Sequence, residues 1–178
     1  SLINFNIAQE LEFTAVAFSR WLPPSKSWID RYGDEHSFDE IAKELLNRPP
    51  SQTACRGTHT PYALVNLARA HEIHRILSPL TISQIEARLA KISSLLELNQ
   101  HSTGVWLGQW YESAEPFTDD DWAHQAIWVT GHHLEWIALV PPQCRPSKEC
   151  VERAVRALVG LLIAQNVQTE TFEVKLPK

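Results

Sequence analysis

Hydrophobic residues recur along the chain at intervals of three and four positions, which is the spacing of one helix face. The clearest stripe consists of Ile82, Ile85, Leu89, Ile92 and Leu96. No persistent segment alternates between apolar and polar residues in the way that a half-buried strand does. The pattern therefore predicts an all-α chain.

Capping residues and prolines divide this pattern into six predicted helices. Asn6 with Gln9, and Ser37 with Glu40, have the spacing of capping boxes. Pairs of prolines end the first, second and fifth helices. The predicted helices cover residues 6–21, 37–48, 58 or 60–77, 82–100, 118–140 and 147–166. The tail after residue 166 is short and partly β-prone.

Short connections between these helices predict a single domain over residues 1–178, built from about three αα-hairpins. An internal echo supports this, because basic residues, Leu and Gln hold matching places in residues 88–100 and 153–165. A weaker echo relates residues 57–62 to residues 131–136. Repeated hairpins are typical of a ring, so we expect a partial or reduced α/α toroid, or a segment of a longer chain.

A compact corner is predicted where the fourth helix stops, at Gln100, Gly104 and Trp106. Glycine can take a backbone conformation that lets the chain reverse. The Trp106 indole can then fold back as an apolar lid, while the Gln100 amide bonds nearby backbone groups. We expect these three residues to have a structural role.

The run from Lys91 through Leu95-Leu96 to Gln100, Gly104 and Trp106 resembles the QW motif of squalene-hopene cyclases and related α/α toroids. Leu95 stands where that motif has an aromatic residue. Segments 55–59 and 130–136 also resemble those of uncharacterised bacterial toroid proteins. The resemblance, which includes the prenyltransferase-type toroids, implies inner helices around a cavity and an outer ring braced by QW corners.

The predicted fifth helix carries the first candidate site. Between Trp122 and Val140 its one formally charged side chain is Glu135, so we expect a buried carboxylate that needs a partner. Three further residues share one face with Glu135, namely His124, Trp128 and His132. The three-residue spacing of His132 and Glu135 lets their side chains meet. They form either an acid/base pair or a structural hydrogen bond in which each group is the other's partner.

The predicted third helix carries His59, His71 and His74 on one arc with apolar residues. These histidines are candidates for lining a cavity, or are ordinary core residues that bond their neighbours. Cys55, His59, His132 and Glu135 together form a weak candidate set for zinc, without the spacing of a standard zinc motif. We expect no cofactor, and keep zinc as the alternative.

Two other motifs admit a functional and a structural interpretation. Asp119, Asp120 and Asp121 invite comparison with the Asp-x-Asp-Asp acid of class II terpene cyclases, but Thr118 replaces the first Asp. A helix cap at Thr118 followed by acids that complement the helix dipole explains them as well. Cys55 before a helix N-terminus could be a nucleophile, although a buried structural thiol is the preferred interpretation.

Composition and charge exclude several classes of protein. A formal charge of −5 argues against a nucleic-acid surface. No apolar run approaches the length of about 20 residues that a membrane span needs, and no signal peptide is present in this segment. The three cysteines favour reduced thiols and a cytoplasmic location over a disulfide framework. The chain starts at Ser1 and has no Met, as a trimmed or excised piece would.

These observations support a toroid-like binding or scaffold domain with a His-, Glu- and Trp-lined inner face that accepts an apolar small molecule. The alternative is an enzyme that acts on an isoprenoid or other apolar substrate through His132 and Glu135. A carbohydrate-active α/α barrel is a third possibility, but it needs a second buried acid. We expect self-association, or pairing with the rest of a toroid, across an exposed edge.

Overall fold

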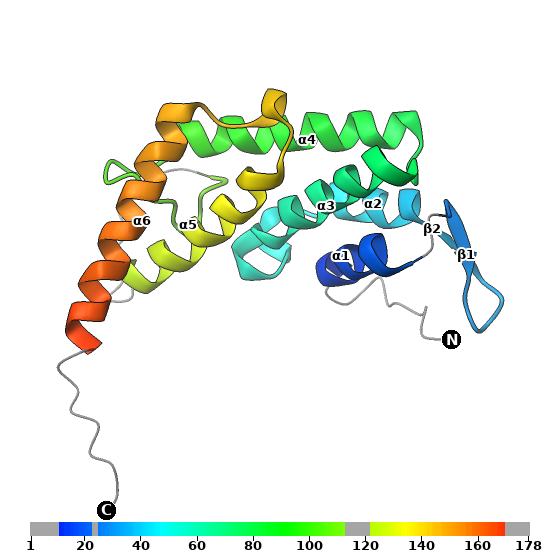
Figure 1. Ribbon diagram of the computed structural model, residues 1–178, viewed down its shortest axis with the longest axis horizontal. Helices are drawn as coiled ribbons and strands as arrows, with labels where there is room; N and C mark the ends of the chain where they lie inside the picture. The colour runs from blue at the N-terminus through cyan, green and yellow to red at the C-terminus, as the bar shows by residue number, and fades with distance from the viewer. Residues whose placement is uncertain (1–10, 23–24, 113–121, 170–178) are drawn as a thin grey trace, which may run out of the picture.

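The computed structural model describes residues 11–22, 25–112 and 122–169, and side chains up to residue 165. Six α-helices fill most of these residues, which confirms the all-α class (Figure 1). They are α1 (Leu11–Trp21), α2 (Phe38–Asn47), α3 (His59–His74), α4 (Pro79–Leu98), α5 (Trp122–Leu139) and α6 (Lys148–Thr169). Three short 3-10 turns accompany them, η1 (Pro50–Gln52), η2 (Cys55–Gly57) and η3 (Pro142–Cys144).

Serine side chains cap the N-termini of two helices, α2 and α4. The Ser37 side chain accepts a hydrogen bond of 3.1 Å from the Glu40 amide, so the predicted cap of α2 is confirmed. Ser78 caps α4 in the same way by accepting from the Thr81 amide. The predicted caps at Asn6 and Thr118, and the acids at 119–121, lie outside the described residues.

Helices α3 and α6 each end three residues away from the predicted position. Helix α3 ends at His74 instead of residue 77, because Arg75 takes a left-handed conformation with a φ of +55°. Helix α6 continues to Thr169, so residues 167–169, expected in a short and partly β-prone tail, are helical.

The prediction of helical structure alone misses one small sheet. Strands β1 (Ser27–Ile29) and β2 (Glu35–Ser37) pair antiparallel, with Trp28 opposite His36. Trp28 is buried, and its ring packs edge-on against Phe18 and Phe38 at centroid distances of 5.6 and 5.2 Å. Three-residue strands are too short to produce a recognisable alternation, which is why the pattern of the sequence does not reveal them.

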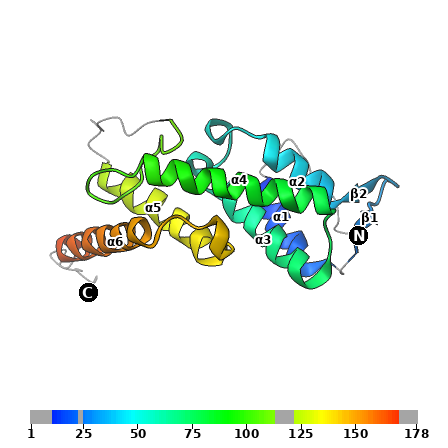
Figure 2. The ribbon, with the colours of Figure 1, turned by 90° about the horizontal axis from the view of Figure 1, so that it is seen from above.

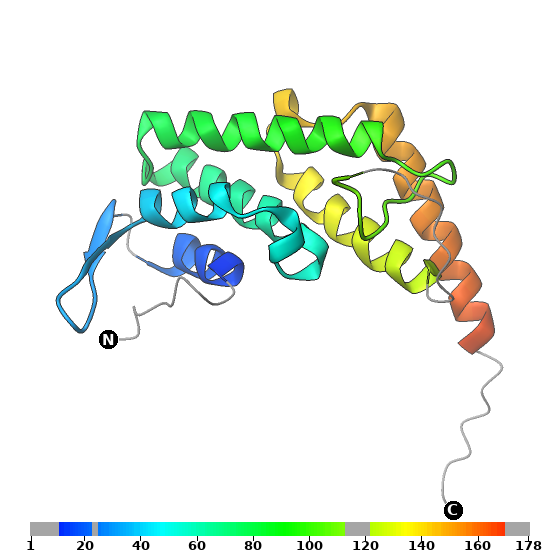
Figure 3. The same cartoon turned by 180° about the vertical axis from the view of Figure 1, so that it is seen from behind.

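Successive helices fold back on one another as hairpins, and α4 extends along most of the long axis of the molecule (Figures 1 and 3). At one end of α4 lie α1, α2 and α3, and at the other end lie α5 and α6 (Figure 2). Helix α3 packs against α1, α4 and α5, and so joins the two ends. The apolar stripe of α4 faces the core, because Ile85, Leu89, Ile92 and Leu96 are all buried.

The corner at residues 100–106 has the contacts expected from its residue types. The Gln100 side-chain amide donates to the carbonyl oxygens of Gly104 and Cys150, at 2.8 and 2.9 Å. The buried Trp106 indole folds back and donates to the Leu96 carbonyl at 2.9 Å. Gly104 has a φ of +97°, so the chain reverses there as predicted. The corner therefore joins the end of α4 to the start of α6.

Candidate functional site

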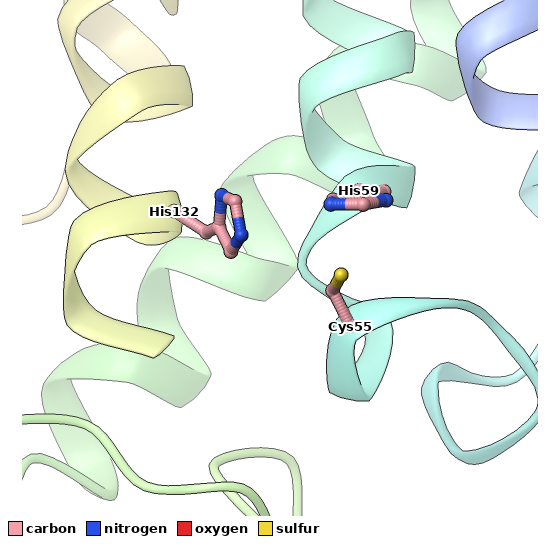
Figure 4. A group of neighbouring side chains, drawn as sticks. All are labelled: Cys55, His59 and His132. Carbon is pink, nitrogen blue, oxygen red and sulfur yellow. The ribbon is translucent and has the colours of Figure 1, made fainter. Parts of the chain in front are cut away.

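The first turn of α3 meets the middle of α5 through two histidines. The ring centroids of His59 and His132 are 5.0 Å apart, with the rings almost perpendicular. Figure 4 shows both rings pointing toward one another across the space between the two helices, with the Cys55 thiol below His59. Side chains from separate parts of the sequence therefore converge at this junction.

A strained turn holds Cys55 next to His59. Cys55 and Arg56 have φ values of +53° and +55°, and Gly57 follows at +82°. Left-handed conformations at two successive non-glycine residues cost free energy, so the surrounding structure must fix this turn. Trp110 does so in part, since its buried indole donates to the Arg56 carbonyl at 2.9 Å. Gly57 leaves no room for a side chain, because a Cβ there would lie 2.6 Å from Pro50 Cβ.

Aromatic rings extend the pair of histidines on both sides. Phe13 of α1 contacts His59 edge-on at 4.8 Å between centroids, and Trp128 contacts His132 at 5.6 Å. Phe13 is 52% exposed and Trp128 is 36% exposed, whereas His59 is buried. The result is a row of four rings that offers apolar surface at its two ends and imidazole nitrogens at its centre.

Glu135 corrects one prediction. Its side chain is 59% exposed, so it is not the buried carboxylate that the apolar composition of α5 indicated. Helices α3 and α6 cover only part of the circumference of α5, and Trp128 and Glu135 remain exposed. The predicted pairing is nevertheless present, because His132 Nδ1 and Glu135 Oε2 are 2.9 Å apart.

The other predicted cavity residues do not reach this junction. His71 and His74 lie at the opposite end of α3 from His59, about 18 Å or more along the helix axis. His71 has a local role there, since its Nδ1 accepts a hydrogen bond from the Leu77 amide, and burial followed by the nearby Arg75 lowers its pKa. His124 is exposed in the first turn of α5.

The most deeply buried histidine is His133, which the prediction did not single out. Its Nδ1 accepts a hydrogen bond of 3.0 Å from the Trp136 indole, so the proton of the neutral ring is on Nε2. That N–H group has no hydrogen-bond partner within the described part of the chain, and it lies among the rings of Trp106 and Trp110. Burial, together with the neighbouring His132, lowers the pKa of His133 to about 3.

A buried acid is also present, and it is Glu12. This residue is 2% exposed, and its carboxylate accepts from the Thr60 hydroxyl at 3.2 Å and lies 3.8 Å from the Arg48 guanidinium. Both partners are distant in the sequence, so nothing in the local pattern around Glu12 indicates its burial. It packs behind the first turn of α3 and helps to position that turn.

Cys144 and Cys150 are reduced, as expected, and both are buried. Burial, and secondarily the Glu97 carboxylate, raises the pKa of Cys150 to about 11. Burial and Glu86 raise the pKa of the Cys144 thiol as well. Cys55 is only half-buried, so it is not the buried structural thiol that the sequence favoured, and of the three thiols it is the accessible one.

Two surface grooves have linings that include neither His59 nor His132. One, of about 840 Å³, runs between α2 and α4 and is lined by mixed charges that include Lys43, Arg88 and Asp39. The other, of about 590 Å³, runs between α5 and α6 and is mainly apolar. Among the described residues, none of the helices combines the length and apolarity needed to cross a lipid bilayer.

Comparison with known proteins gives no assignment, since no family profile, no curated protein and no solved structure matches this chain.

Proposed function

We propose that the chain is a helical binding domain whose site is the junction of α3 and α5. The observation that carries this proposal is the 5.0 Å contact between the rings of His59 and His132. A buried Glu12 and a strained turn at Cys55 both support the first turn of α3, and such support is expected where side chains must be held in place.

An apolar small molecule is the ligand class that suits the junction best. Phe13 and Trp128 are large apolar side chains that remain partly exposed at either end of the site. Between them, the imidazole groups and Glu135 supply a few polar contacts. Apolar walls with a small number of convergent polar groups are typical of small-molecule sites.

A catalytic role on an isoprenoid or other apolar substrate is the second candidate. It is favoured by the 2.9 Å contact between His132 Nδ1 and Glu135 Oε2. A carboxylate at that distance fixes the orientation of the ring, as in an acid/base pair.

We also propose that the chain forms part of an α/α toroid. Three helix hairpins and the corner at Gln100–Trp106 support membership of the squalene-hopene cyclase and prenyltransferase-type superfamily, as part of a ring. An exposed apolar face of α6 supports association with a second copy or with the rest of such a ring. That face consists of Val155, Val159, Leu162 and Ile163.

Ligand binding is tested by thermal unfolding of the chain in the presence of farnesol, a single isoprenoid chain with one hydroxyl group. We expect farnesol to raise the melting temperature. We also expect Trp128→Ala to weaken farnesol binding about fivefold, because an aromatic contact is worth about 1 kcal/mol. Trp122→Ala is the matched control, since Trp122 is also an exposed tryptophan of α5, at 40%, but it is not in the row of rings.

Absence of any farnesol effect, or an equal loss in the Trp122 and Trp128 variants, contradicts the proposed ligand class.

Glu135→Gln separates the two candidate functions. A binding domain keeps most of its farnesol affinity in that variant. An enzyme that converts farnesyl diphosphate loses turnover through the loss of the acid/base pair, while the ligand still binds.

Self-association is tested by sedimentation equilibrium over a range of chain concentrations. We expect dimers or larger assemblies that Val159→Lys disrupts, because a charge on the apolar face of α6 is costly to bury. Ile73→Lys places the same charge on an exposed apolar position of α3 and should leave the assembly unchanged. A wild-type chain that stays monomeric at all concentrations contradicts the proposed association.

A further inference from the structure

The same junction contains a third group besides the two histidines. One ligand atom each from Cys55, His59 and His132 lies within 4.8 Å of the others (Figure 4). Cys55 comes from η2, His59 from the first residue of α3 and His132 from α5. From this convergence we propose that Cys55, His59 and His132 form a binding site for a zinc ion.

The donor atoms determine which metal the site favours. One thiolate sulfur and two imidazole nitrogens are ligands that zinc prefers over the harder cations. Around a tetrahedral zinc ion such atoms are separated by about 3.4 Å, given metal–ligand bonds of about 2.0 to 2.3 Å. The three side chains therefore need to move together by only about 1 Å, which small changes in their χ angles accomplish.

Glu135 has a different place in this site from the one that the sequence predicted. It is not one of the three converging ligands. Its carboxylate instead lies 2.9 Å from Nδ1 of His132, on the far side of that imidazole from a metal held by Nε2. A carboxylate in this position fixes the tautomer and the orientation of the coordinating ring.

Three protein ligands leave one position of a tetrahedral zinc ion open. The exposed rings of Trp128 and Phe13 lie on either side of the two histidines, so a zinc ion held here would be next to the proposed apolar ligand. A zinc ion at the same junction deepens the proposed function. The role of the metal rests on that function, whereas the binding of the metal does not.

The test starts from chain that has been freed of metal with a chelator and then titrated with zinc alone. We expect one zinc per chain by elemental analysis, and protection of the Cys55 thiol from alkylation by iodoacetamide. Cys55→Ser, His59→Ala and His132→Ala should each weaken zinc binding at least about a hundredfold, and Glu135→Gln about tenfold. Far-ultraviolet circular dichroism checks that each variant is folded.

Two exposed histidines supply matched controls. His74→Ala and His124→Ala remove histidines of α3 and α5 that lie outside the group, and both variants should bind zinc as the wild type does. No stoichiometric zinc, zinc that survives in the three ligand variants, or a Cys55 thiol that zinc does not protect overturns the inference. Farnesol binding to the metal-free chain is measured separately, so loss of that binding alone overturns only the proposed function.

Discussion

At the scale of single residues, His133 shows how strongly burial determines protonation. The ring accepts a hydrogen bond from the Trp136 indole and lies against Trp106 and Trp110, so a second proton would face an indole N–H group in an apolar environment. The neighbouring His132, in contrast, is partly exposed and bonded to Glu135. Two adjacent histidines therefore have a structural and a candidate functional role, respectively.

The depressed pKa of His133 predicts a specific dependence of stability on pH. Below pH 6.5 the unfolded chain binds a proton at this residue, while the folded chain does not until about pH 3. Its contribution is therefore fully present above pH 6.5 and is lost as the pH falls toward 3, by about 1.4 kcal/mol per unit. Chemical unfolding at several pH values should show this slope in the wild type and a correspondingly smaller slope in His133→Gln. Parallel curves for the two proteins contradict the assignment.

At the scale of elements, the junction of α4 and α6 depends on close approach of the backbone at Gly104. A Cβ at this position would lie 2.8 Å from the carbonyl oxygen of Arg153, and the φ of +97° disfavours any other residue. Gln100 reinforces the same junction through its bond to the Cys150 carbonyl. The corner thus fixes the start of α6 relative to the end of α4.

Gly104→Ala should lower the free energy of unfolding by about 3 kcal/mol, through backbone strain and the steric clash with α6. Gly160→Ala is the control, because Gly160 lies in the exposed middle of α6 with open space around it. That change should raise stability by about 0.5 to 1 kcal/mol, as alanine is the better helix former. Denaturant titration measures both effects. Equal and small effects at the two glycines contradict the described packing of the corner.

The elements differ in how far the sequence predicts them. Ser37 with Glu40 specifies a helix start through local bonds alone, and the corner at Gln100 follows from three residues close together in the chain. The hairpin that contains Trp28 and His36 was missed because its stability comes from contacts with Phe18 and Phe38, not from a periodic pattern. Local chemistry is readable from sequence, whereas packing partners far along the chain are not.

At the scale of the whole molecule, the candidate site could be predicted only in part. The prediction of one cavity lining from His59, His71 and His74 used only their angles around the helix. It ignored the rise of 1.5 Å per residue, which separates His59 from the other two. The apolar composition of α5 indicated a buried Glu135. That prediction was wrong because composition does not tell which faces of a helix its neighbours cover. Cys55, His59, His132 and Glu135 were grouped by residue type, and the packing of α3 against α5 brings ligand atoms of the first three together.

In the proposed zinc site, η2, the first turn of α3 and the middle of α5 bring Cys55, His59 and His132 together. A crystal structure of the chain grown with zinc, with anomalous data collected on both sides of the zinc absorption edge, tests this site. We predict a zinc peak bonded to the Cys55 sulfur and to one nitrogen each of His59 and His132, with Glu135 still bonded to Nδ1 of His132. A map without a peak at this junction, or a structure in which the two histidines are far apart, would contradict the proposed site.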